Sequence, residues 1–98
     1  MNKEFCIMIP SEFYSTERKP GLERHECLFG KNRKKSIEDG LVVFITPYQH
    51  RGTQGVHGKD GHDFDLYLKK QAQISWCKYY NKTNDEFVSR YGKTYIWN

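Results

Sequence analysis

The sequence predicts one small α+β domain over residues 1–98, in which a strand–strand–helix (ββα) unit is followed by two longer helices. Three observations lead to this prediction. The chain has 98 residues, enough for one hydrophobic core but not for two. Five consecutive apolar residues over 41–45 indicate a buried strand, and apolar residues at every fourth position over 63–80 indicate an amphipathic helix. The ββα unit is expected at about 22–58, with helices at about 62–80 and 84–91.

The first 21 residues carry the weakest pattern. Phe5–Ile9 is a short apolar run that could pair as a strand, and Pro10 would end it. The polar stretch that follows closes on Pro20-Gly21, which is a turn signal. We expect this segment to lie across the core or to form a contact in a homo-oligomer.

Two strands are expected between residues 23 and 45. Residues 23–29 have mixed polarity and are followed by Gly30, so we predict a strand there. Residues 31–36 are too charged for a core and too few for a stable helix, which predicts a loop or hairpin insert, and residues 36–40 predict a turn that ends on glycine. For Leu41–Ile45, the length and the β-branched residues favour a strand over a helix.

A short helix is predicted directly after the second strand. Thr46 suits the N-cap position and Pro47 suits the first helical position. The helix must be brief, because Gly52 and Gly55 follow quickly. The glycines at 55, 58 and 61 indicate a flexible loop, which carries His57 and His62.

Residues 63–80 give the clearest helical pattern. The apolar positions form one stripe that is expected to pack in the core. The opposite, polar face is predicted to hold Lys69, Lys70, Gln73 and Lys78.

A second helix is predicted to begin after Thr83, which forms a capping box with Glu86. Gly92 is the natural residue to end it. Its inward positions are expected to be Phe87, Val88 and Tyr91, and the last apolar residues, 95–97, are expected to dock back onto the domain.

Composition and charge narrow the classes of partner and compartment. The net charge of +4 favours an anionic partner, of which nucleic acid is the commonest. Cys6, Cys27 and Cys77 are far apart and form no CxxC pair, which excludes a cysteine zinc knuckle and makes a reducing cytoplasm the simplest compartment. No apolar run reaches the roughly 20 residues that span a bilayer, and the first residues do not resemble a signal peptide, so no membrane partner is expected.

Three of the four histidines lie within residues 25–57 and flank the predicted helix start. A single histidine is more often a surface or core residue than a ligand, but this clustering predicts that His25, His50 and His57 bind one divalent metal ion. Imidazole suits zinc, nickel, manganese or magnesium to differing degrees. On one straight helix His50 and His57 would be roughly 10 Å apart, so Gly52 and Gly55 must let the chain curl back. His62 lies outside this pattern and is expected to be a loop or helix-start residue.

The segments around these histidines resemble the HNH nucleases, whose ββα-metal unit is shared by nuclease colicins, many homing endonucleases and many small phage proteins. The resemblance is carried by residues 24–30, 32–36, 39–43, 46–50 and 55–57, and a weaker likeness runs on through residues 61–63 and the long helix. It covers residues 23–58 and looks most like the small HNH proteins of phages and prophages. It implies a metal-dependent DNA endonuclease or nickase in the cytoplasm of a bacterial host.

The resemblance also implies roles for individual residues. In the family, the first residue of a strand pair binds the metal, the second is the general base that activates water, and helix histidines complete the site. This makes His25 and His50 ligands, with His57 as the third, and places Glu26 in the base position that is usually histidine. A glutamate with its ordinary pKa near 4.3 is already deprotonated at neutral pH, so Glu26 could still orient and deprotonate a water. Alternatively, His25 is the base and the metal has fewer protein ligands.

The asparagine that gives the family its middle letter has no obvious counterpart. The position nine residues before His50 is Leu41, so only Asp39 or Asn32 could take a similar orienting part. Arg24 cannot be a ligand, because a guanidinium stays protonated.

DNA contacts are expected from cationic residues beside this centre. Side chains that would neutralise phosphates are Arg24, Lys31, Arg33, Lys34 and Lys35. Arg51, next to His50, would clamp the scissile phosphate or stabilise the charged transition state.

Because Glu26 departs from the family pattern, two other hypotheses stay open: a non-catalytic, metal-stapled DNA- or protein-binding module, and a purely structural small domain.

Overall fold

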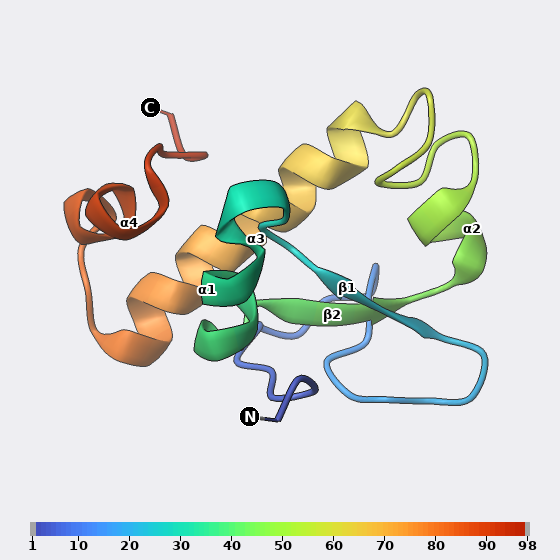
Figure 1. Cartoon of the computed structure of the whole chain (residues 1–98), viewed down its shortest axis with the longest axis horizontal. Coiled ribbons are helices and arrows are strands. Elements are labelled where there is room, and N and C mark those ends of the chain that lie inside the picture. The colour runs from blue at the N-terminus through green and yellow to red at the C-terminus, as the bar shows by residue number, and fades with distance from the viewer. Residues whose placement is uncertain (1, 98) are drawn as a thin grey trace.

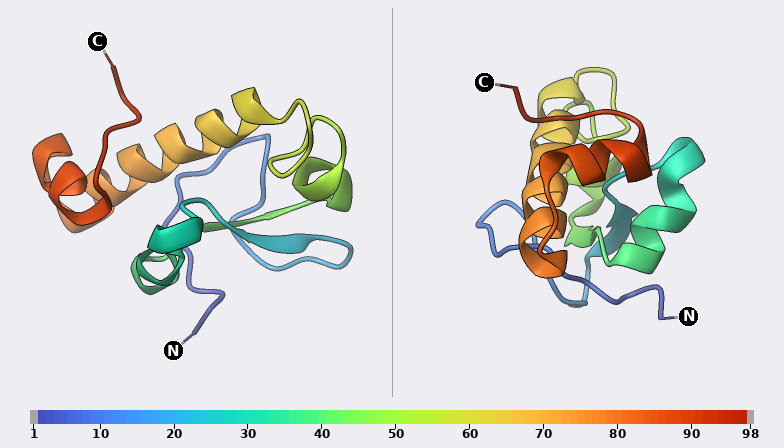
Figure 2. Two further views of the ribbon diagram at one scale, coloured as in Figure 1. Left: turned by 45° about the horizontal axis from the view of Figure 1, so that its top comes forward. Right: turned by 90° about the vertical axis from the view of Figure 1, so that its left-hand side faces the viewer.

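A two-stranded antiparallel sheet crossed by one long helix forms the centre of the fold in the computed structural model, which describes residues 2–97 (Figure 1). The elements, in chain order, are β1 (Glu23–Glu26), the 3₁₀ helix η1 (Gly30–Asn32), α1 (Arg33–Asp39), β2 (Val42–Ile45), α2 (Pro47–Arg51), α3 (His62–Tyr80) and α4 (Asn84–Tyr91). In the left view of Figure 2, α3 runs over the sheet, and α2 and α4 lie at opposite ends of α3. The predicted α+β class is confirmed.

The register of the two strands decides which side chains face α3. His25 on β1 lies opposite Val43 on β2, and Glu23 lies opposite Ile45. Val43 and Ile45 belong to the core cluster that includes residues of α3. Because directly opposed residues of a pair share a face and successive residues alternate, His25 and Glu23 face α3, whereas Arg24 and Glu26 face the other way.

The connection between the strands is helical, so the predicted loop or hairpin insert at residues 31–36 was wrong. α1 contains most of the basic block and is held by tertiary contacts that a local pattern does not reveal. Ser36 and Ile37 are buried. The Lys35 ammonium group donates to the Arg90 carbonyl oxygen at 2.8 Å, and the Tyr91 hydroxyl donates to the Lys35 carbonyl oxygen at 3.1 Å. The helix ends at Gly40, in the left-handed conformation (φ 79°) that glycine adopts readily. The first strand is also shorter than predicted and ends at Glu26.

The N-terminal segment contributes to the core, but Phe5–Ile9 is not a strand. Ile7 and Met8 are buried in the main cluster, as is Tyr14. Ser15 pairs with Phe44 through reciprocal backbone hydrogen bonds of 2.9 Å, which places this segment beside β2. Of the two alternatives for this segment, a place across the core is confirmed, and an oligomer contact stays a prediction.

α3 confirms the predicted long helix and its apolar stripe. Leu68, Ala72 and Trp76 are buried. Gln73 was predicted on the polar face but is fully buried, because its amide holds the C-terminal tail: its oxygen accepts from the Tyr95 backbone N–H at 2.7 Å. Within residues 2–97, no helix is both long and apolar enough to cross a membrane.

α4 begins with the predicted capping box, in which Thr83 and Glu86 exchange side-chain and backbone hydrogen bonds. Phe87 and Tyr91 are buried, one turn apart on the same face. Val88 was predicted to point inward but is exposed, since it is turned about 100° from Phe87 around the helix.

The C-terminal tail docks through one of its aromatic residues only. Tyr95 is buried in the core cluster, whereas Trp97 is 60% exposed. The predicted docking of residues 95–97 is therefore confirmed for Tyr95 and wrong for Trp97.

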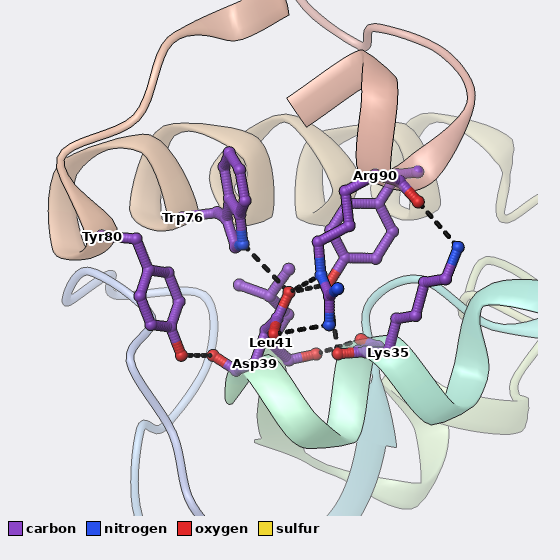
Figure 3. Close-up of polar contacts among 8 residues, drawn as sticks. Lys35, Asp39, Leu41, Trp76, Tyr80 and Arg90 are labelled. Carbon is purple, nitrogen blue, oxygen red and sulfur yellow. Dashed lines mark hydrogen bonds and ion pairs between the residues drawn. The ribbon is translucent and has the colours of Figure 1, made fainter. Parts of the chain in front are cut away.

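A buried carboxylate ties α1 to α3 and α4 (Figure 3). Asp39 accepts from the Trp76 indole N–H at 2.9 Å and from the Tyr91 hydroxyl at 2.6 Å. Arg90 adds a two-pronged ion pair, and the Asp39 backbone oxygen accepts from the Tyr80 hydroxyl at 2.9 Å. A buried charge is tolerated when it is paired and hydrogen-bonded in this way.

Candidate metal centre

Three imidazoles converge at one end of the sheet, from β1, from α2 and from the loop that precedes α3. The ring centroids of His25 and His50 are 5.1 Å apart, those of His25 and His57 are 5.2 Å apart, and those of His50 and His57 are 4.9 Å apart. One nitrogen from each ring lies within 4.8 Å of the other two. The sequence-based prediction that these histidines come together is confirmed, and His62 is not part of the group.

His25 forms the buried wall of this centre. It is 2% exposed, and its Nε2 is buried with no hydrogen-bond partner within the described chain. Burial, together with the neighbouring His50 and His57, lowers the pKa of His25 to about 3. The ring is therefore neutral at pH 7, as a metal ligand must be. An orphaned nitrogen in an apolar wall costs free energy unless something binds it.

His50 is oriented by a carboxylate that the sequence analysis did not single out. Its Nδ1 lies 2.9 Å from a Glu23 carboxylate oxygen, which holds the ring and leaves Nε2 as the nitrogen available to a metal ion. Arg51 also pairs with Glu23, and both neighbours lower the pKa of that carboxyl. Metal-binding histidines usually have such an outer partner. The signal was present in the sequence, because Glu23 is two residues before His25 and so shares its face of the strand.

The chain curls back after α2, as the spacing of His50 and His57 required. The Thr46–Gln49 capping box and Pro47 start α2 as predicted. After Gly52 the chain reverses, and the backbone N–H of His57 donates to the His50 carbonyl oxygen at 3.1 Å. Gly55 permits this approach: a Cβ there would lie 2.4 Å from the Gln49 carbonyl oxygen.

The donor set fits a divalent ion with a small inward movement of the rings. Zinc–imidazole distances of about 2.1 Å put the nitrogens of two tetrahedral ligands roughly 3.4 Å apart. The candidate nitrogens of the three histidines lie within 4.8 Å of one another. His50 is half-buried and His57 is exposed, so their rings can rotate inward against the fixed His25. Three imidazoles leave one position open, the pattern of catalytic rather than structural zinc sites.

The structure does not bring Glu26 into this group. Its carboxylate is ion-paired with Arg24 and Arg33, and it lies on the opposite face of β1 from His25. No contact within residues 2–97 joins it to the imidazoles, so its role as general base stays a prediction. The alternative role of His25 as the base likewise stays a prediction.

The two residues considered for the asparagine role lie elsewhere. The Asn32 amide donates to the Tyr91 carbonyl oxygen at 3.0 Å, and Asp39 is engaged with α3 and α4. Within residues 2–97, the carboxylate that hydrogen-bonds a histidine of the centre belongs to Glu23 and not to either of these residues.

The predicted DNA-contacting residues occupy several surroundings. Arg24 is mostly buried beside Glu26, and Lys35 is tied to the Arg90 carbonyl oxygen at 2.8 Å. Lys31 and Lys34 are exposed. With Arg33 and Lys3, they line a pocket of about 500 Å³ over Gly30 and Ile37. Lys3, which no sequence pattern indicated, reaches this basic block from the N-terminal segment.

Two further residues border the histidines. The centroid of the Phe29 ring lies 5.1 Å from that of the His57 ring and 5.7 Å from that of the His25 ring. The ammonium group of Lys69 lies 4.5 Å from the centre of the Phe29 ring and contributes to the lowered pKa of His25. Lys69 was predicted on the polar face of α3, but its side chain is only 19% exposed.

No family model matches the chain, and neither a curated protein nor a solved structure shows significant similarity to it.

Substitution of Gly55 by alanine is expected to lower metal affinity and to destabilise the fold by about 1–3 kcal/mol. The added methyl group would meet backbone atoms of α2, which cannot move aside as a side chain can. Isothermal titration with Zn²⁺ and urea unfolding measure the two effects. Gln54→Ala, an exposed change in the same loop, should match the wild type. Unchanged Zn²⁺ affinity in Gly55→Ala would contradict the need for this close approach.

Proposed function

We propose that this protein is a metal-dependent DNA endonuclease or nickase that hydrolyses phosphodiester bonds. The observation that carries the proposal is the convergence of His25, His50 and His57, with an unpartnered buried nitrogen on His25. The resemblance of residues 23–58 to HNH nucleases supports the same reading, as does the helix start at Thr46 that presents His50. The ligand count supports catalysis, because three imidazoles leave a coordination position free.

Each residue of the centre would have a distinct part. His25 would be the fixed ligand, since burial keeps its ring neutral and in place. His50 would be aligned by Glu23, and His57 would close the site from the exposed side. A divalent ion held by these rings would supply Lewis-acid stabilisation of the negative charge that develops on the phosphate. Arg51 is 64% exposed beside His50 and would exchange Glu23 for a phosphate oxygen.

The basic pocket would be a second place for DNA phosphates to bind. Gly30, in the pocket, directly follows Phe29, whose ring contacts two of the three histidines. Lys3, Lys31 and Lys34 make no ion pair within residues 2–97, so their charges are free to neutralise phosphates. A strand bound along these residues would enter the site past Phe29.

One observation favours a second candidate, a metal-stapled DNA- or protein-binding module without catalysis. Glu26 occupies the base position of the resemblance, but its carboxylate is held by Arg24 and Arg33 on the far face of β1. Such a module would keep the metal and the basic pocket and would lack a proton acceptor at the site.

Metal content and plasmid nicking together test the proposal. We expect about one divalent ion per purified chain, and conversion of supercoiled plasmid to the nicked form with Mg²⁺, Mn²⁺, Zn²⁺ or Ni²⁺ that stops on addition of a chelator. DNA binding without nicking in any of the four metals would favour the module. Absence of bound metal, with no change in melting temperature on adding metals, would favour the hypothesis of a purely structural small domain.

A further inference from the structure

We infer that Lys69 belongs to the same site, and that its ammonium group binds a phosphate oxygen of the nucleic acid beside the three histidines. This inference rests on the proposed function and adds to it a residue from α3, an element outside the ββα unit.

The position of Lys69 is defined by groups on three segments. Asp65, one turn earlier on α3, accepts a hydrogen bond from Nζ at 2.8 Å. The ammonium group also faces two aromatic rings, Phe29 at 4.5 Å and Tyr95 at 5.7 Å. Long lysine side chains on a helix surface are ordinarily mobile, so this restraint is unusual. The Phe29 ring that Lys69 faces also contacts His25 and His57.

Lys69 retains hydrogen-bonding capacity in this position. An ammonium group has three donors, and Asp65 accepts one of them. The aromatic faces attract the charge without accepting a conventional hydrogen bond. At least one donor is therefore available to an oxygen anion at the edge of the histidine centre.

The charge of a metal ion in the centre would also favour an anion there. Once the histidines hold a divalent cation, Lys69 places a further positive charge near His25, whereas the charge of the neighbouring Arg24 is already paired with Glu26. Asp65 offsets only one of these charges. A phosphodiester, which has two non-bridging oxygens and a negative charge, can interact with both the metal position and Lys69.

A purely structural role for Lys69 would make different predictions. A clamp between α3, Phe29 and the Tyr95 tail would contribute to stability but not to the salt dependence of DNA binding. Each phosphate contact adds about 0.9 to the slope of log binding constant against log salt for duplex DNA. The slope therefore separates the two roles.

The test compares Lys69→Met with Lys70→Met. Methionine keeps much of the aliphatic stem and removes the charge, and Lys70 is the exposed neighbour on the same helix, which has none of these contacts. Binding of the full chain to a phosphorothioate duplex that resists hydrolysis is measured by fluorescence anisotropy across a salt series, and kcat/KM for nicking is measured on ordinary DNA. Lys69→Gln replaces Lys69→Met if circular dichroism shows that the methionine variant does not fold.

We expect Lys69→Met to reduce the salt slope by about 0.9 and kcat/KM roughly tenfold or more. Lys69→Arg should recover most of both, and Lys70→Met should match the wild type. Unchanged slope and rate in Lys69→Met, while the wild type nicks DNA, would overturn this inference alone. A wild type that neither binds nor nicks DNA would overturn the proposed function and the inference together.

Discussion

Replacing His50 with alanine is expected to abolish plasmid nicking while leaving the far-ultraviolet circular dichroism spectrum of a folded domain. His50 supplies one of three converging imidazoles and lies outside the hydrophobic core cluster, so its loss removes a metal ligand without creating a core cavity. Loss of a residue that hydrogen-bonds a metal ligand typically lowers activity roughly 10–100-fold. The nicking rate of His50→Ala should fall by more than this, because the ligand itself is removed. Glu23→Gln, which weakens only the orientation of His50, should fall within that smaller range.

His62→Ala is the matched control for this experiment. His62 is exposed at the start of α3 and is not in the histidine group. Its removal should leave nicking and metal content at wild-type levels. Full activity in His50→Ala would refute the assignment of the centre.

Asp39→Ala is expected to cause the largest loss of stability, about 3–5 kcal/mol. The change removes a carboxylate that serves Trp76, Tyr91 and Arg90, and leaves their donors without their main partner in a largely buried site (Figure 3). Domains of this kind are stable by about 5–15 kcal/mol in total. Urea unfolding followed by tryptophan fluorescence measures the difference.

Glu38→Ala tests whether this loss is specific to the network. Glu38 is the preceding residue on α1, is exposed, and should change the free energy of unfolding by less than about 0.5 kcal/mol. A loss in Asp39→Ala no larger than that in Glu38→Ala would show that the network contributes little to stability.

The elements with strong local signals were predictable from the sequence. The apolar run at 41–45, the Thr-Pro start of α2 and the four-residue spacing in α3 each depend on neighbouring residues, and each is confirmed. The two glycines between His50 and His57 likewise predicted the reversal that brings those rings together.

The features that depend on long-range contacts were not predictable. α1 looks too polar and short to be a helix, and its stability comes from partners such as Arg90 and Tyr91 that only the fold brings near. Gln73 was placed on the polar face, because no local pattern shows that its amide binds the tail. Lys69 was misplaced for the same reason, since Phe29 is 40 residues away in the chain.

The pairing of Ser15 with Phe44 bears on how the protein behaves at high concentration. A two-stranded sheet has two open edges. If the backbone groups at the outer edge of the fully apolar strand β2 were unpaired, they could pair with a strand of a second molecule. The reciprocal hydrogen bonds with Ser15 occupy the backbone of Phe44, and the Arg18 guanidinium covers the face of its ring at 5.0 Å. The N-terminal segment thus covers the edge of β2 at Phe44 and limits its pairing with a second molecule. This effect does not depend on any chemistry at the histidines.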